Sequence, residues 1–226
     1  MKSLIGAVAV AVTVALAMSN HALAAAYDDS INAARMGNTS ELSSLLDQGL
    51  LPDTVDENGN SLLILASREG NVEIVDLLIK RGAQVAYQNP AGDSALSLAA
   101  LQGHTEIVDM LLNAGAPIGN TGWTPMIYAA FNGHLEIVKR TIDRGAVIDQ
   151  RAPNQATALM LAARNGHTEV VRYLLSKGAD ATLENDQGRT ARSWALEKSN
   201  TDAAGLIDAN LKARGIKPKP LTIEIK

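Results

Sequence analysis

Three histidines occupy the same position in successive copies of one repeated phrase, and they are the first candidates for metal chemistry. His104, His134 and His167 each follow a glycine and precede a short apolar run. Imidazole nitrogens bind zinc at about 2 Å, so the ligands of one ion must lie within about 4 Å of one another. If the copies stack as helices, equivalent points lie about 8–10 Å apart. The three histidines therefore cannot share one ion, and we expect them to form hydrogen bonds between neighbouring units.

Other residue types that could carry catalysis are absent or badly placed. The chain has no cysteine, which excludes disulfides, thiolate zinc sites and cysteine nucleophiles. Ser94, in the stretch GDSAL, lacks the second glycine that a nucleophile elbow requires. The carboxylates are spread over predicted turns and helix surfaces. We therefore predict no catalytic residue, no metal and no cofactor, so that the function depends on a surface.

The histidines belong to a repeat that predicts the elements around them. Glycines at 37, 70, 103, 133 and 166 are separated by 33, 33, 30 and 33 residues, and glycines at 49, 82, 115, 145 and 178 give the same differences. Each copy contains an alanine-rich segment closed by glycine, and then an apolar stripe such as Ile107, Val108, Leu111 and Leu112. This pattern predicts two short helices in each unit.

Several motifs recur in phase with this period and resemble ankyrin repeats. They are TP at 124–125, the alanine pair at 99–100, GH–EIV and LL–GA. The resemblance covers about residues 27–211 and implies an all-α solenoid of stacked helix-turn-helix units, with β-turn fingers and a concave surface. The sequence departs from the family where the histidine of the TPLH motif is expected. That position holds Ile64, Ser97, Ile127, Met160 and Ser193, so the hydrogen bonds of that histidine must be replaced or lost.

The first 24 residues are predicted to be a cleaved secretory signal peptide. Lys2 precedes an apolar run from Leu4 to Met18, and small residues follow. As a helix this run would span roughly 22 Å, less than a bilayer core of about 30 Å, which disfavours the alternative of an uncleaved anchor. Cleavage after Ala24 and after Ala26 fits equally well. We expect a bacterial periplasmic protein with no membrane attachment after cleavage.

The rest of the chain is predicted to contain two caps around the regular repeats. Residues 27–56 form the amino-terminal capping repeat, 57–183 the central repeats, 184–215 a degenerate carboxy-terminal capping repeat and 216–226 a tail. The last repeat loses the GH–EIV motif, as expected of an end unit that needs a polar outer face. Trp194, within this cap, is predicted to belong to the core.

The fourth unit carries the strongest candidate for a binding surface. It contains the one phenylalanine, Phe131, and one of the two tryptophans, Trp123, at positions expected to face outward. The spacing of 30 rather than 33 residues between the glycines at 103 and 133 indicates a three-residue deletion. This deletion shortens the finger before Trp123 and would leave a notch. We hypothesise that Trp123, Phe131 and Leu101 anchor a protein partner, with Arg68 and Arg164 at the rim. The alternative is that the rings only fill the gap left by the short finger.

Taken with the resemblance, these features predict a non-catalytic protein–protein interaction module in the periplasm. The partner would be another protein, bound by the concave face and the fingers. The net charge of −4 argues against nucleic acid as a partner.

Some exported bacterial proteins that this chain resembles accompany catalases, so the resemblance permits a role in oxidative-stress defence. An immunity protein that blocks a periplasmic toxin is one alternative, and an enzyme or small-ligand receptor is a weaker one. The oligomeric state stays open.

Overall fold

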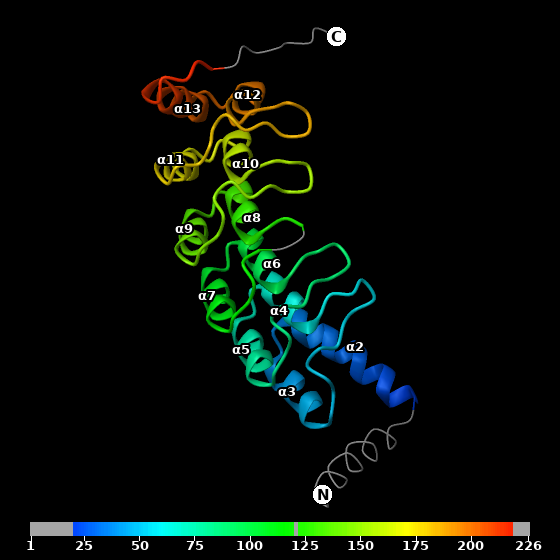
Figure 1. Ribbon diagram of the computed structural model, residues 1–226. Helices are drawn as coiled ribbons and strands as arrows, with labels where there is room; N and C mark the ends of the chain where they lie inside the picture. The colour runs from blue at the N-terminus through cyan, green and yellow to red at the C-terminus, as the bar shows by residue number, and fades with distance from the viewer. Residues whose placement is uncertain (1–19, 120–121, 219–226) are drawn as a thin grey trace, which may run out of the picture.

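The chain is an all-α solenoid, as predicted, in a computed structural model that describes residues 20–119 and 122–218. Helices alternate between two parallel rows, and the loops project from the side of the inner row (Figure 1). The inner row contains α2 (Asn20–Met36), α4 (Leu62–Glu69), α6 (Ala95–Gln102), α8 (Pro125–Asn132), α10 (Ala158–Arg164) and α12 (Ala191–Glu197). The outer row contains α3 (Thr39–Asp47), α5 (Val72–Lys80), α7 (Thr105–Asn113), α9 (Leu135–Asp143), α11 (Thr168–Ser176) and α13 (Thr201–Ala213).

Local sequence sets where each inner helix begins and ends. A serine or threonine stands at the N-cap and accepts a hydrogen bond from the backbone N–H three residues later, as Thr124 does from Ile127 at 3.3 Å. Glycine ends several of these helices in the left-handed conformation, for example Gly103 at φ +85°. The same N-cap hydrogen bond is made at the start of α4, α6, α10 and α12 by Ser61, Ser94, Thr157 and Thr190.

The position of the missing TPLH histidine is filled by serine in two units, by isoleucine in two and by the buried Met160 in one, where Sδ of Met160 accepts a hydrogen bond from the Thr157 backbone N–H at 3.5 Å. Ser97 accepts a hydrogen bond from the Ser94 backbone N–H at 2.8 Å and donates one to the Ser94 carbonyl at 3.0 Å. Ser193 makes the same pair of bonds to Thr190. Ile64 and Ile127 instead are fully buried in the core. The hydrogen bonds are thus replaced by serine in two units and exchanged for apolar packing in two others.

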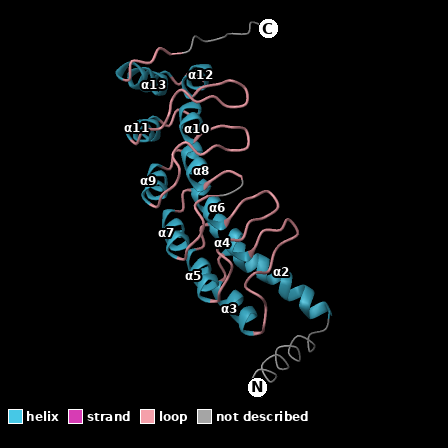
Figure 2. Ribbon diagram, viewed as in Figure 1, coloured by secondary structure: helices cyan, strands magenta, loops and turns pink. Residues whose placement is uncertain are grey.

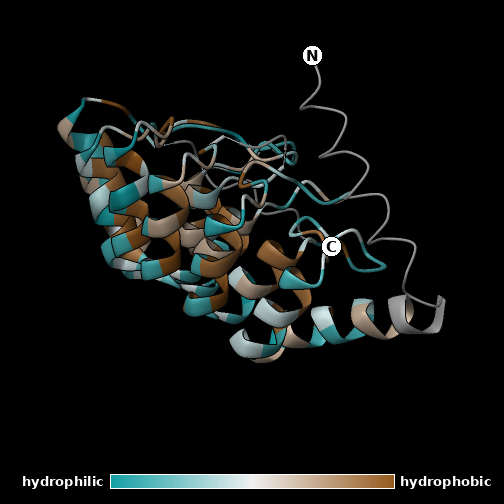
Figure 3. Cartoon of the chain, turned by 90° about the horizontal axis from the view of Figure 1, so that it is seen from below, coloured by the Kyte–Doolittle hydropathy of each residue, from teal (hydrophilic) through white to brown (hydrophobic). Residues whose placement is uncertain are grey.

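The hydrophobic core is a continuous layer between the two rows of helices. Ile107, Val108 and Leu111, predicted to form one stripe, are completely buried, and Trp194 is 8% exposed, which confirms it as a core residue. Figure 3 shows the apolar residues concentrated in the helices of the stack. The extensive helix contacts join helices of one repeat or of adjacent repeats. No repeat can bury its apolar face alone, so stability depends on each neighbour.

Fingers connect each outer helix to the next inner helix, and Figure 2 shows them as loops. Within the described ranges, two of them close with an isolated antiparallel bridge, between Val55 and Ser61 and between Gln88 and Ser94. The predicted notch, between Gly115 and Trp123, includes residues 120–121, which lie outside the described residues.

The amino-terminal helix α2 begins at Asn20, so both predicted cleavage points lie within it. Residues 1–19, which make up most of the predicted signal peptide, and residues 219–226 of the predicted tail lie outside the described part of the chain. Among the helices that are described, none combines the length and the apolar character needed to cross a membrane.

A ladder of side-chain hydrogen bonds joins every repeat to the one before it. Nε2 of His104, His134 and His167 lies 3.2, 3.1 and 2.9 Å from a backbone oxygen of the preceding inner helix. Because a carbonyl oxygen can only accept, Nε2 carries the hydrogen. The predicted hydrogen bonding between units is thereby confirmed. Asn71 and Asn200 take the same position at the two ends and donate Nδ2–H to the equivalent carbonyls.

The glycines that end the inner helices also make room for this ladder. A Cβ at Gly103 would lie 2.7 Å from Cε1 of His134, which is closer than real Cβ contacts, and Gly70 and Gly133 stand in the same relation to His104 and His167. Gly115 has almost the same backbone, at φ +85°, yet nothing lies within 4 Å of its Cβ position. Glycine is therefore required at position 103 for two reasons: the backbone is left-handed there, and a side chain would collide with His134.

This difference gives a matched pair of variants. Gly115→Ala should cost about 1–2 kcal/mol of unfolding free energy, because alanine is strained in the left-handed region. Gly103→Ala should cost clearly more, since it also displaces the His134 ring. Urea denaturation of both variants measures the difference, and equal losses would show that the close approach of His134 contributes nothing.

Candidate protein-binding surface

We call the surface formed by the inner helices and the bases of the fingers the inner face. One row of side chains on it precedes the closing turn of each inner helix from α2 to α10 and holds Arg35, Arg68, Leu101, Phe131 and Arg164. All five are half-buried. The backbone carbonyls of these same residues accept the hydrogen bonds of the ladder. Their backbone positions are therefore fixed, while their side chains differ from unit to unit.

The aromatic residues of the fourth unit form one cluster on this face. The ring centroids of Trp123 and Tyr128 lie 5.2 Å apart, and those of Trp123 and Phe131 lie 5.7 Å apart in an edge-to-face arrangement. Such spacings are favourable for aromatic pairs. Trp123, Phe131 and Leu101 also pack against the core while remaining partly exposed. The expectation that the two rings face outward is thus only half right, because each ring is buried on one side.

Tyr128 links this cluster to the preceding finger. Its hydroxyl donates to Oδ1 of Asp93 at 2.8 Å. Burial, followed by the hydrogen bond and the charge of Asp93, raises the pKa of Tyr128 well above its usual value, so the phenol stays neutral and continues to donate. The equivalent position in neighbouring units holds Leu98 and Leu161, which are buried. The sequence-based hypothesis did not include this contact, and the in-phase change from leucine to tyrosine was its only signal.

Two exposed asparagines reinforce the backbone beneath the cluster. Asn132 donates Nδ2–H to the Leu101 carbonyl at 2.7 Å, and Asn165 donates to the Phe131 carbonyl at 2.7 Å. Each of these carbonyls thus accepts two hydrogen bonds from the following repeat, one of them from a histidine. The predicted anchor residues Leu101 and Phe131 are held at adjacent steps of the stack. We call Leu101, Trp123, Tyr128 and Phe131 the aromatic ledge.

The two predicted rim arginines lie on either side of the aromatic ledge. Arg68 is on α4, one repeat before Leu101, and its Nε donates to Oε1 of Glu69 at 2.9 Å. Arg164 is on α10, one repeat after Phe131, and its guanidinium carbon lies 5.2 Å from the centroid of the Trp194 ring. Four of the five predicted residues lie on four consecutive inner helices, and Trp123 lies just before α8, so all five belong to one surface. Arg68 and Arg164 have different contact partners, Glu69 and Trp194 respectively.

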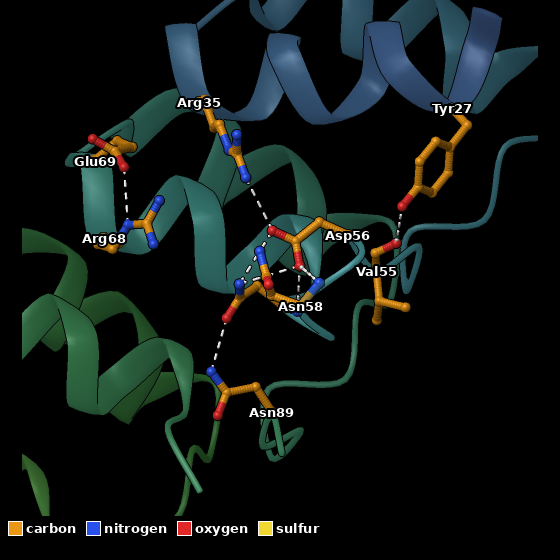
Figure 4. A network of polar contacts seen from close by, with 9 residues as sticks. Tyr27, Arg35, Val55, Asp56, Asn58, Arg68, Glu69 and Asn89 are labelled. Atoms are coloured by element: carbon orange, nitrogen blue, oxygen red, sulfur yellow. Dashed lines mark hydrogen bonds and ion pairs between the residues drawn. The ribbon is translucent and has the colours of Figure 1, made fainter. Parts of the chain in front are cut away.

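A network of polar contacts stabilises the amino-terminal end of the inner face (Figure 4). Asp56 pairs with Nη2 of Arg35 at 3.0 Å and accepts hydrogen bonds from the backbone of Asn58 and Asn60. Asn89 then donates to Oδ1 of Asn60 at 2.8 Å, which joins the second and third fingers. Burial alone would raise the pKa of Asp56, but the hydrogen bonds from Asn60, Asn58 and Arg35 outweigh it and lower that pKa below its usual value.

The chemistry of the inner face is that of a contact surface. Over the described residues, no group of three histidine, aspartate or glutamate side chains is placed to hold a metal ion. Acidic groups on the face are engaged structurally, as Asp93 is by Tyr128 and Asp56 by Arg35. What the face offers is fixed apolar area with polar groups around it, which is the composition of a protein interface.

Comparison with known proteins identifies the family. Models of ankyrin repeats, one built on three copies and one on many copies, match residues 81–152 and 139–214 and residues 31–79 respectively. The fold is that of an ankyrin solenoid, and ankyrin repeats indicate a protein–protein interaction module. The chain belongs to the ankyrin-repeat family. Among curated proteins, none matches this sequence.

Two solved structures are similar over most of the chain. The human ASB11 ankyrin repeat domain has 26% identity and a TM-score of 0.74, and the match covers 80% of this chain and 82% of that chain. The second is a chain of the complex between the predatory endopeptidase Bd0816 from Bdellovibrio bacteriovorus and the immunity protein Bd3460. It has 28% identity and a TM-score of 0.73, and the match covers 80% of this chain and 97% of that chain.

The Asp56 network makes stability depend on pH. A carboxylate with a lowered pKa stabilises the fold above its ordinary pKa of about 3.9, and that stabilisation is lost as the pH falls through the pKa of the folded state. Asp56→Asn should therefore flatten the decrease in unfolding free energy between about pH 6 and pH 3. Asparagine is a fitting replacement, because Asn89 and Asn185 hold the equivalent position in other fingers.

Urea denaturation at several pH values checks this prediction. Glu57→Gln, which removes an exposed neighbouring carboxylate outside the network, serves as the control. A wild-type pH dependence in Asp56→Asn, or an equal flattening in the control, would contradict the assigned role of Asp56.

Proposed function

We propose that this protein is a non-catalytic binding module of the bacterial periplasm and that it holds its protein partner on the inner face. The observation that carries the proposal is the aromatic ledge. Its rings are stacked on one another and packed against the core, yet they stay partly exposed. A rigid aromatic area loses little conformational entropy on binding, which is why such residues dominate the affinity of many interfaces.

The position of the ledge supports this role over simple gap filling. In three other repeats the equivalent of Tyr128 is a buried leucine, Leu65, Leu98 or Leu161, and packing is satisfied there without a ring. In the last repeat the equivalent is Trp194, which is itself buried, whereas Tyr128 stays partly exposed. The equivalents of Phe131 in the other repeats are Leu101, three arginines and Glu197, which shows that the core does not require an aromatic residue at this step. Three ring-bearing substitutions in one repeat, all on one face, favour a function for that face.

For the kind of partner, the similarity to a chain of the endopeptidase–immunity protein complex favours the immunity alternative. We propose that the partner is a hydrolytic enzyme that this chain holds inactive. The inner face carries ion-paired arginines as well as acids, so this proposal does not rest on a net charge of that face. Support of a catalase and export to the periplasm both stay predictions.

The aromatic ledge can be tested with one double variant. Trp123→Ala/Phe131→Ala should lose at least about 100-fold in partner affinity, because truncated hot-spot residues cost about 2 kcal/mol or more each. Tyr173→Ala, on outer helix α11, removes a half-buried ring away from the ledge and should bind normally. The partner is first captured from periplasmic extract with the wild-type chain, identified by mass spectrometry, and then titrated calorimetrically.

The outcomes separate the alternatives. If the captured partner is a hydrolase, its activity should fall on addition of the wild-type chain and recover with the double variant. Capture of a catalase whose activity is preserved would instead favour oxidative-stress defence. Full affinity in a folded Trp123→Ala/Phe131→Ala protein would show that the rings serve packing alone.

A further inference from the structure

The arginines on the inner face differ in how their charge is balanced. Arg35 is paired with Asp56 at 3.0 Å, and Arg68 with Glu69 at 2.9 Å. Arg189, at the base of the sixth finger, is paired with Glu197. Arg164 has no ion pair with any described residue, and its charge is instead set against an aromatic ring. The cation on the carboxy-terminal side of the aromatic ledge is thus uncompensated, while the one on the amino-terminal side is neutralised.

The Arg164 guanidinium is also held in place. It lies over the ring of Trp194, which is 8% exposed and so cannot readily move. The backbone carbonyl of Arg164 accepts a hydrogen bond of 2.6 Å from Nδ2 of Asn200. The contact with the ring is neither an ion pair nor a hydrogen bond, so the N–H groups of the guanidinium can still donate to an anion. Arg164 therefore offers hydrogen-bond donors beside a fixed ring, and binding an anion there would cost little ordering.

We propose that Arg164 is a carboxylate-binding subsite for an aspartate or glutamate of the protein partner. This inference rests on the proposed function and adds the chemistry and the direction of the bound segment. The charge of Arg164 is complementary to an acid, and carboxylates match the planar fork of arginine with two hydrogen bonds. The apolar anchor of the partner occupies the aromatic ledge, and its acid lies one repeat further toward the carboxy-terminal cap.

The spacing of the repeats sets the spacing of the two partner residues. Neighbouring inner helices are separated by about 10 Å, and an extended chain advances about 3.3 Å per residue. An extended partner segment should therefore carry its acidic residue about three positions from its aromatic or aliphatic anchor. Arg68, at the other end of the ledge, is already paired with Glu69, so we expect no acidic partner residue there.

Selection from a random 12-residue peptide library displayed on phage tests this inference with the full chain as bait. The wild-type protein should enrich peptides with an acidic residue about three positions from an apolar anchor. Arg164→Gln should keep the apolar anchor but lose the acidic preference, whereas Arg172→Gln, which removes an exposed arginine on outer helix α11 away from the inner face, should keep both. Fluorescence anisotropy with one selected peptide should show a loss of about tenfold in affinity for Arg164→Gln, the usual size of a lost charged hydrogen bond. Arg164→Lys should restore part of it.

Each result decides between the two proposals, once circular dichroism shows that the variants are folded. An unchanged acidic preference in Arg164→Gln, or equal effects of Arg164→Gln and Arg172→Gln, overturns the carboxylate subsite. Normal selection by Trp123→Ala/Phe131→Ala overturns the role of the aromatic ledge, whether or not the acidic preference depends on Arg164. Absence of any enriched peptide with the wild-type bait overturns both.

Discussion

The structure depends on the ladder of hydrogen bonds between repeats. In each rung, the histidine or asparagine that follows a helix-ending turn donates to a backbone carbonyl of the previous inner helix. Such a hydrogen bond requires an imidazole or a carboxamide that can reach back across the interface, as in His134 and Asn200. It also requires a turn residue without a side chain, because the ring lies where a Cβ would stand at Gly103. The apolar layer supplies most of the burial, but apolar contacts are non-directional. The ladder gives the stack its register.

The same constraint explains why a binding surface can vary without harm to the fold. Carbonyls of the ladder belong to the residues whose side chains make up the inner face, such as Leu101 and Phe131. Wherever another repeat follows, the backbone at this step accepts the same kind of hydrogen bond, while the side chain is free to be arginine, leucine or phenylalanine. Ankyrin repeats thus separate the groups that hold the stack from the groups that meet a partner. The fourth unit uses this freedom for an aromatic cluster, and the fifth uses it for an arginine without a counter-ion.

The sequence predicted much of this architecture because its signals are local and repeated. The 33-residue period, the glycine turns and the stripe containing Leu111 each depend on residues a few positions apart, and in-phase repetition reinforced them. Geometry also sufficed to assign the histidines, since their spacing excludes a shared metal ion. Trp194 could be placed in the core because it falls within a helix of an amphipathic unit.

The remaining features depend on side-chain partners that spacing alone does not reveal. Asn71 and Asn200 stand in the histidine register, but their role became evident only when their Nδ2 groups were seen to reach the preceding carbonyls. Trp123 packs against the core and contacts Tyr128 and Phe131, and these ring contacts could not be read from its position in the repeat. The difference between Arg68 and Arg164 likewise depends on which neighbour each side chain meets, a glutamate in one case and an indole in the other.

Hydrogen–deuterium exchange of His134→Ala tests most directly whether the repeats are held pairwise by the ladder. Loss of the 3.1 Å bond to the Leu101 carbonyl should speed amide exchange in α6 to α9. Exchange in α2 and α13 should stay at the wild-type rate, because the extensive helix contacts join helices of one repeat or of adjacent repeats. Unchanged exchange at α6 and α8, or a uniform increase from α2 to α13, would contradict this account.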